Sequence, residues 1–344
     1  MADPVIRSAS LNGYLELARS LGLNPAAMMR RAGLSRRCLD DPETPISALA
    51  VSALLEGSAA AAGVENFGLR LAQGRRLANL GPLSIVLREA PTGRQALDTL
   101  CRYLRLLNAS LLTRIEDSGD TVLIREEFLL DGADSVRQSM ELAVGVMQRI
   151  LAELLGPRWK PRRVCFAHRP PQSLALHHAV FGRQVEFNSA VNGIVCAAAD
   201  LAAPLPPADT GMAPYAQRFL DQALSQADGS THDAARQLIA ALLPGGRCSA
   251  EQVAQHLGMD RRTLHRHLLT RGSNFSALIA QVRREFAVRQ IRDSDRSLAE
   301  LAELLGFSSA SALAFWFRQQ FGCSVSQWRE AHVTPEAAAS PVST

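Results

Sequence analysis

The chain has 344 residues, of which 47% are hydrophobic, so it is long enough for about two domains that each have a core of their own. Its first residues, MADPVIRSASLNGY, lack a charged segment followed by an apolar run, and its most apolar stretch, residues 46–63, is interrupted by Glu56 and Gly57. We therefore expect a soluble, cytoplasmic protein with no membrane partner. The six cysteines are far apart and form no C-x-x-C, which excludes the usual zinc and disulfide patterns, and we expect no metal and no cofactor.

The net charge of +4 is unevenly distributed along the chain. Between Arg247 and Arg329 there are twelve arginines and seven acidic residues, a net charge of +5, so the rest of the chain is about neutral. Arginine suits phosphate and guanine because its fork donates two hydrogen bonds at once. Charge alone fits a solvated surface about as well as a nucleic-acid interface.

The first two hundred residues mix helix and strand patterns. We expect helices over 11–21, 25–32, 46–61, 93–108 and 135–155. LLTRIED and TVLIREEF predict a hairpin that turns at Ser118 to Asp120, and RRVCFAH and GIVCAA predict two further strands. This half is therefore expected to be an α/β or α+β domain.

A change of composition marks the domain boundary. The stretch AAPLPPADTG at 202–211 contains three prolines, which interrupt regular structure. We expect an effector-binding or dimerisation domain over 1–205, a linker with a helix over 206–229, an all-α domain over 230–333 and a disordered tail over 334–344.

Two short stretches of the second half repeat each other. SAEQVAQHLGM at 249–259 and SLAELAELLGF at 297–307 each begin with a Ser followed three residues later by Gln or Glu, which is the capping box of a helix start. Each then places apolar residues on one face and reaches a Gly that allows a sharp reversal. With the helices expected downstream, the repeat predicts two helix-turn-helix motifs. The helices expected in this half are 213–226, 232–242, 249–257, 260–270, 275–292, 297–304, 309–321 and 325–331.

One long helix, 275–292, lies between the two motifs. Its apolar residues fall on one face, so it is expected to pack on both neighbours and to set the distance and angle between them. Two rigidly coupled motifs of one chain could then bind one duplex. A protein with a single helix-turn-helix must instead form a dimer to place two such motifs in successive major grooves, about 34 Å apart.

Residues 230–332 resemble the DNA-binding domain of the AraC/XylS family of bacterial transcription regulators. The resemblance runs through RRTLHRHL, VRREFAVRQI, SLAELAELLGFSSASALAFWF and the closing FGCSVSQWR. The upstream stretch FGRQVEFNSAVNGIVCAAADLAAPLP is similar to the effector domain of the branch that contains ornithine-utilisation and quorum-related regulators. That domain is called arabinose-binding-like by analogy, so the resemblance implies an effector domain without identifying its ligand.

The reading face of the first motif follows from helical spacing. Leu264 and Leu268 form a buried seam at i and i+4, which leaves a stripe of Arg262, His265, Arg266 and Leu269 exposed. In a major groove this stripe presents forks to guanine edges, and the family resemblance implies base contacts at the same positions Arg262, His265 and Arg266. Arg261 and Arg271 lie to the side and are expected to contact phosphates. His265 and His267 diverge by about 200° around the helix, so they cannot share a metal ion.

The second motif has a different stripe. Leu313 and Phe317 take the buried places, which leaves Ser311, Ala314, Phe315 and Arg318 exposed. We expect base contacts from Ser311, Ala314 and Phe315, but the last two can only touch a thymine methyl group. Ser308 and Ser309 at the helix cap, with Arg318, are expected to contact phosphates. The second motif should therefore strengthen DNA binding and fix the position of the protein on the duplex, and should contribute little to sequence specificity.

Together these features predict a ligand-responsive transcription regulator that binds double-stranded DNA. The basic cluster Arg162, Arg163, His168 and Arg169, beside an expected strand, is the candidate site for an anionic effector. One alternative is a ligand-independent DNA-binding protein whose first domain only mediates oligomerisation, in a homodimer for example. Another is an enzyme with a DNA-binding appendage, but residues 1–205 show no recognisable acid, base and nucleophile set, and we expect no enzymatic activity. An activator would also contact RNA polymerase, yet activation and repression differ by where the site lies relative to the promoter.

Overall fold

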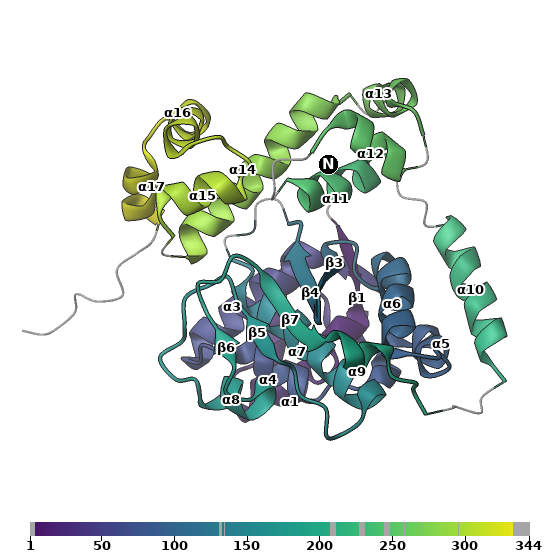
Figure 1. Ribbon diagram of the computed structural model, residues 1–344. Helices are drawn as coiled ribbons and strands as arrows, with labels where there is room; N and C mark the ends of the chain where they lie inside the picture. Colours follow the sequence, from purple (N-terminus) through teal and green to yellow (C-terminus); the bar gives the residue numbers. More distant parts are fainter. Residues whose placement is uncertain are drawn as a thin grey trace, which may run out of the picture. The chain divides into compact units, whose positions relative to one another are not determined.

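The computed structural model describes residues 4–130, 133, 135–206, 211–226, 231–243, 248–257, 259–270, 272–294 and 296–332. The chain forms two compact units, Met1–Asp228 and Gly229–Thr344 (Figure 1). The tail expected to be disordered, 334–344, lies outside the described residues.

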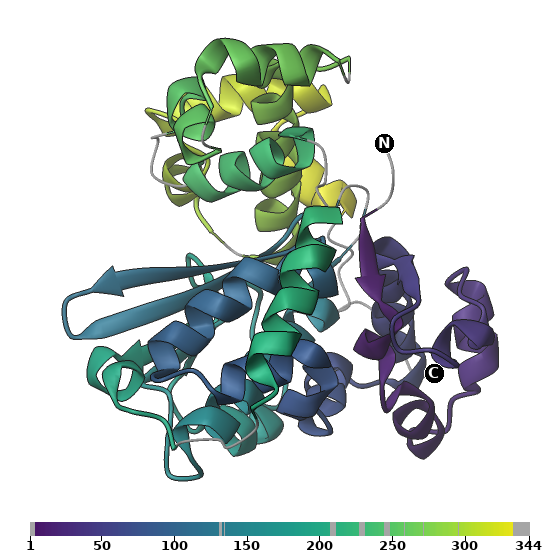
Figure 2. The same ribbon diagram turned by 90° about the vertical axis from the view of Figure 1, so that its right-hand side faces the viewer.

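The first unit is a mixed α/β domain built on a five-stranded sheet of order β3-β4-β7-β5-β6. All its pairs are antiparallel except β5 with β6, so of the two fold classes expected, α+β is the better description. The expected hairpin forms in full register, from Leu111 opposite Phe128 to Ser118 opposite Thr121, and Figure 2 shows it in side view. The strands of this sheet are β3 (Leu111–Ser118), β4 (Thr121–Phe128), β5 (Arg163–Cys165), β6 (Val185–Glu186) and β7 (Asn192–Ala197).

The helices of the first unit cover this sheet and form a second cluster around the N-terminal helices. The main core joins sheet residues such as Ile124 to the long helices α6 and α7, while Tyr14, Met29 and Phe67 belong to the second cluster. A small pair of strands, β1 (Val5–Arg7) and β2 (Pro45–Ser47), joins the second cluster to the start of the chain. The helices are α1 (Tyr14–Ser20), α2 (Pro25–Arg31), α3 (Ala48–Ala62), α4 (Phe67–Gln73), α5 (Pro82–Arg88), α6 (Gly93–Leu107), α7 (Arg137–Leu155), α8 (Ala175–Phe181), α9 (Ala198–Ala202) and α10 (Ala213–Gln226), with short 3-10 turns at Ser8–Leu11, Arg36–Leu39 and Leu77–Leu80.

Helix α7 touches both clusters because glycines let α4 approach it closely. A Cβ atom at Gly68 would lie 1.9 Å from the carbonyl oxygen of Gln138, and one at Gly145 would lie 2.6 Å from the Cβ of Ala72. The approach is fixed by a hydrogen bond, since the N–H of Gly68 donates to Oε1 of Gln138 at 2.9 Å. Side chains larger than hydrogen at these two positions would separate the helices.

The helix expected in the linker is α10, and it packs against α5 and α6 of the first unit. Its Asp221 accepts hydrogen bonds from the Tyr103 hydroxyl at 2.6 Å and from Arg102 at 2.9 Å. Burial, with the Asp221 carboxylate beside it, raises the pKa of Tyr103 to about 12. The segment after the proline-rich stretch thus adds a layer to the first unit.

In the described residues of the second unit, the regular structure is all helix. Its helices are α11 (Thr231–Leu242), α12 (Ala250–His256), α13 (Arg261–Leu269), α14 (Phe275–Asp293), α15 (Leu298–Leu304), α16 (Ala310–Phe321) and α17 (Val325–His332). Each end falls within one residue of the range expected from the sequence, so the all-α prediction is confirmed.

Among the described residues, no single helix is long and apolar enough to cross a membrane. The pair α3 and α4 passes that test only when joined across a bend of 106°.

Candidate nucleic-acid interface

The two repeats begin with the same reciprocal cap. The N–H of Ser249 donates to the side chain of Gln252, and the N–H of Gln252 donates to that of Ser249, both at 3.2 Å. Ser297 and Glu300 exchange the corresponding hydrogen bonds at 2.8 and 3.3 Å. Hydrogen bonds from the Ser297 hydroxyl and N–H hold the pKa of Glu300 below its usual value. Both predicted capping boxes are therefore present.

The two turns also end alike. The N–H of Met259 donates to the carbonyl of Ala254 at 3.0 Å, and the N–H of Phe307 donates to that of Ala302 at 2.8 Å. These bonds close a helix end over a left-handed residue, which in the second motif is Gly306 with φ of 70°. The equivalent Gly258 lies outside the described residues. The repeated sequence thus gives a repeated helix, turn and helix.

Helix α13 has the predicted two faces. It begins at Asp260, whose carboxylate accepts the N–H of Thr263 at 2.7 Å, and that bond holds the pKa of Asp260 below its usual value. Leu264 and Leu268 are its two buried residues. The expected reading residues are all exposed, on one stripe of the helix: Arg262, His265, Arg266 and Leu269.

Arg261 and Arg271 are the two residues of the first motif that are expected to contact phosphates. Arg261 is exposed and its guanidinium lies 2.7 Å from the carboxylate of Glu251 on α12. A phosphate contact would replace this surface ion pair, which costs little because both partners are solvated. Arg271 lies outside the described residues.

Helix α16 presents the second stripe. Its cap is Ser309, whose hydroxyl accepts the N–H of Ala312 at 3.1 Å, and Ser308 is exposed just before it. Leu313 and Phe317 are its two buried residues. The outer stripe carries exposed Ser311 and Arg318, a half-buried Ala314, and Phe315, whose side chain is 69% exposed. Phe315 is the most exposed of the large hydrophobic side chains among the described residues, so its ring is available to a partner.

Helix α14 connects the two motifs. On the side of the first motif, α11 packs on α12, α13 and α14, and Arg236 of α11 forms an ion pair of 2.7 Å with Glu285 in the middle of α14. At its end, Phe286 and Ile291 enter the core that holds Phe317 of α16 and Trp328 of α17. Each motif therefore packs on the same helical framework, which fixes one motif relative to the other.

Several arginines of the second unit hold this framework together. Arg283 donates to the carbonyl of Leu305 at 3.1 Å and lies over the ring of Phe307. Arg329 donates to the carbonyl of Arg296 at 2.6 Å, and the buried Arg296 donates to Oε1 of Gln290. Part of the basic excess seen in the sequence is thus structural, and the arginines exposed on α13 and α16 are Arg261, Arg262, Arg266 and Arg318.

The basic cluster expected to receive an effector is dispersed in the first unit. Arg162 and Arg163 form exposed ion pairs with Asp120 at 2.7 Å and with Glu186 at 3.1 Å. His168 is buried, and its Nδ1 lies 2.8 Å from the carbonyl of Arg169. None of the four cluster residues lines the cavity described below.

His168 belongs to a buried group around Glu141. Nε2 of His177 lies 3.2 Å from Oε1 of Glu141, and the fully buried Glu141 also faces Arg137 at 3.7 Å. Burial lowers the pKa of His168 to about 4, so it is neutral at physiological pH. No group of three or more metal-binding side chains occurs in the part of the chain that the structure describes. Rings of Phe166 and Phe187 pack on both histidines, which makes the group part of the core.

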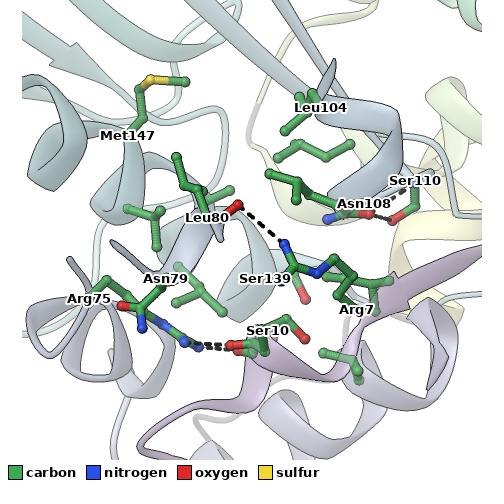
Figure 3. Close-up of a pocket in the computed structure, with 18 of the residues that line it drawn as sticks. Arg7, Ser10, Arg75, Asn79, Leu80, Leu104, Asn108, Ser110, Ser139 and Met147 are labelled. Atoms are coloured by element: carbon green, nitrogen blue, oxygen red, sulfur yellow. Dashed lines mark hydrogen bonds between the residues drawn. The ribbon is translucent and has the colours of Figure 1, made fainter. Parts of the chain in front are cut away.

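The first unit contains a cavity of about 150 Å³. It lies among β1, β4, α3, α6 and α7, and most of its lining is aliphatic. In Figure 3, Arg75 and Ser10 lie at one side of the cavity and Met147 and Leu104 at the opposite side. Arg75 is held by the carbonyls of Ala9 and Ser10, and burial lowers its pKa to about 10. This cavity is not among the sites that the sequence motifs predict.

The second unit, with two capped helix-turn-helix motifs on a shared helix, is the DNA-binding part of a transcription regulator. Residues 22–205 match the model for the arabinose-binding domain of AraC transcription regulators, and residues 253–331 match a helix-turn-helix domain. The chain belongs to the AraC family of transcription regulators, as the sequence resemblance implied.

Relatives of similar length support this assignment. The chain is 30% identical to the HTH-type transcriptional regulator VirS of Mycobacterium tuberculosis, and the match covers 94% of this chain and 96% of VirS. It is 27% identical, with the same coverage, to the ornithine utilization regulator of Pseudomonas aeruginosa. Among solved structures, the regulator CdpR of P. aeruginosa matches 90% of this chain and 96% of its own, at 19% identity and a TM-score of 0.42. VirS and the ornithine utilization regulator are both regulators by name.

Proposed function

We propose that this regulator selects its DNA sites mainly through α13 and responds to a small molecule bound by its first unit. The observation that carries the first part is the exposed stripe of Arg262, His265 and Arg266 on a helix fixed by two buried leucines and a capping Asp260. A rigid helix that exposes two guanidinium groups on one face suits bidentate contacts with guanine.

The second motif strengthens DNA binding and fixes the position of the protein along the duplex. Its stripe offers Ser311, Ala314 and Phe315 to the bases, and the two small or apolar side chains can contact a thymine methyl group but cannot donate to guanine. Ser308, Ser309 and Arg318 contact phosphates, together with Arg261 and Arg271 of the first motif. Because α14 couples the motifs, we propose that both bind one duplex about one helical turn apart.

The effector is placed in the cavity and not at the basic cluster. Arg162 and Arg163 already have carboxylate partners, and His168 faces a buried core group. The mostly aliphatic cavity of the first unit supports a ligand-responsive regulator over a domain that only mediates oligomerisation, because protein interiors are otherwise closely packed. We assign no catalytic step to either unit.

Selection from randomised duplexes tests the DNA part of the proposal. We expect one stringent block with guanines and, about one turn away, one loose or A·T-rich block. Two equally stringent blocks, each assigned to its motif by directed cleavage from a tethered reagent, would contradict the roles given to Ala314 and Phe315.

A further inference from the structure

The cavity contains one acidic side chain where a core residue is expected. Along β4, Val122, Ile124 and Phe128 face the helices and are buried in the main core. Side chains of a strand alternate between its faces, so Glu126 faces the helices as well. It lines the cavity, and its side chain is almost completely buried, with the whole residue 3% exposed.

This carboxyl group is incompletely satisfied. Oε2 of Glu126 has no hydrogen-bond partner among the described residues, and neither does Oγ1 of Thr113, the residue opposite it on β3. Leaving such a buried group unpaired costs free energy, so a protein retains it where something else pairs with it. A ligand in the cavity is the partner that this position can reach.

The protonation state of Glu126 limits what that partner can be. Burial raises its pKa from 4.5 to about 8, so at neutral pH it is mostly a neutral acid that can both donate and accept a hydrogen bond. The other ionisable groups of the lining are Arg7, Arg75 and Arg76, and Cys101 of α6 is close enough for its own pKa to be raised in part by Glu126. These arginines disfavour a cationic ligand.

Of the three lining arginines, Arg76 is exposed, and Arg7 and Arg75 already donate to other groups of the protein. Arg75 donates to the carbonyls of Ala9 and Ser10, and Arg7 donates to the carbonyl of Leu80 and to the carboxylate of Glu43 (Figure 3). The charge of Arg7 is compensated by Glu43, although its buried Nε has no hydrogen-bond partner among the described residues. An uncharged ligand leaves these contacts intact, whereas an incoming carboxylate would give up its water for only a partial set of donors. The contacts therefore favour an uncharged molecule at Glu126.

Size completes the description. A cavity of about 150 Å³ with an aliphatic lining is large enough for one benzene ring. Leu100, Leu104, Met147 and Ile150 supply the apolar contacts for such a ring. A hydroxyl group on the ring can accept from a protonated carboxyl and donate to its other oxygen.

We propose that the cavity binds a neutral phenol, or an alcohol of similar size, with its hydroxyl group on Glu126 and its ring among the leucines of α6 and the apolar residues of α7. The assignment rests on the proposed effector role of the first unit. It names the ligand class and the residue that selects it.

The test compares matched ligands on the full-length protein by calorimetry. Phenol and toluene have the same shape and differ in the hydroxyl group, while benzylamine and benzoate add charge of either sign. We expect phenol to bind at least about tenfold more tightly than toluene, the effect of one good hydrogen bond. Equal affinity for phenol and toluene, or tighter binding of benzylamine or benzoate, would overturn the proposal.

Variants locate the contact. Glu126→Leu should bind toluene more tightly than phenol, whereas Glu126→Gln, which can still donate and accept, should keep the preference for phenol. Glu116→Gln, on the outer face of the same hairpin, should behave like the unmodified protein. A preference for phenol that survives in folded Glu126→Leu protein would show that the hydroxyl group binds elsewhere.

A separate measurement keeps this proposal distinct from the regulatory one. The affinity of the full chain for its DNA site is measured by fluorescence anisotropy with and without saturating phenol. A change that is lost in Glu126→Leu supports both proposals. If phenol binds and the affinity for DNA is unchanged, the cavity binds phenol but has no effector role. If the affinity for DNA responds to another ligand that does not compete with phenol, the first unit has an effector role but the assignment of phenol to the cavity is wrong.

Discussion

Phe315 offers the sharpest test of the second motif because its exposed area can be converted to an expected affinity. A phenylalanine buries roughly 200 Å² when fully covered. With 69% of Phe315 exposed, about 140 Å² is free to be covered by a partner, which at about 25 cal/mol per Å² sets an upper limit near 3.5 kcal/mol. A base contact on one face of the ring covers about half of this area. We therefore expect Phe315→Ala to lose about 1 to 2 kcal/mol of DNA-binding free energy, a factor of roughly 5 to 30 in Kd.

The salt dependence shows the nature of the contact. An apolar contact displaces no counterions, so the slope of log K against log salt should be unchanged in Phe315→Ala, whereas Arg318→Ala should flatten it by about one unit. Titrations of labelled duplex by fluorescence anisotropy at several salt concentrations measure both quantities. Phe219→Ala removes a similarly exposed ring, 60% exposed, from α10 of the first unit and serves as the control. Full affinity in Phe315→Ala would refute the placement of this ring against DNA.

Three further predictions concern stability and independence. Because the folded-state pKa of Glu126 lies above its unfolded value, folding favours its protonated form, so the free energy of unfolding should fall as pH rises from about 4.5 to 8; urea titrations should show that this decline is smaller in Glu126→Gln, and an unchanged profile would contradict the burial of an unpaired carboxyl. Asp260→Ala should destabilise the second unit by about 1 kcal/mol through loss of the α13 cap, while Asp260→Asn, also a good cap, should leave its thermal unfolding nearly unchanged. A fragment of residues 228–344 should fold as a helical unit and bind DNA, seen by circular dichroism and gel shift, but should not respond to phenol; a soluble fragment that fails to bind at low salt would show that the first unit is needed for DNA binding.

The second unit was predictable because its sequence marks each helix locally. Ser249, Asp260, Ser297 and Ser309 each cap a helix, and apolar spacing identifies the buried face of each one. A further Ser-x-x-Gln box, Ser324 with Gln327, caps α17 and is a local signal of the same kind. Such signals act within four residues, so they do not depend on the rest of the fold.

The first unit was predicted less completely because several of its elements are too short to carry local sequence signals. Helices α4, α5, α8 and α9 have seven residues or fewer, and strands β1, β2 and β6 have three or two, so none is long enough for a clear periodic pattern. These elements form because they pack on parts of the chain far away. Glu126 did carry a sequence signal, since it interrupts the apolar alternation of Val122, Ile124 and Phe128, but the cavity around it depends on side chains from distant segments.

The sequence alone also does not distinguish arginines that are exposed from arginines that stabilise the fold. Arg262 and Arg283 look alike in the sequence, yet one is exposed on α13 and the other donates to the turn before α16. Only the packing of α14 separates an arginine that is free to contact DNA from one that holds the two motifs together.

The central claim is that α13 reads bases through Arg262 and Arg266 while Arg261 contacts the backbone. The most direct measurement is the Kd of Arg262→Ala, Arg266→Ala and Arg261→Ala for the selected site and for an unrelated duplex at the same salt concentration. We expect each of the first two changes to cost about 1 to 3 kcal/mol on the selected site and to relax preference at one or two base pairs, and Arg261→Ala to weaken both duplexes equally. Equal losses on both duplexes in all three variants would contradict the claim.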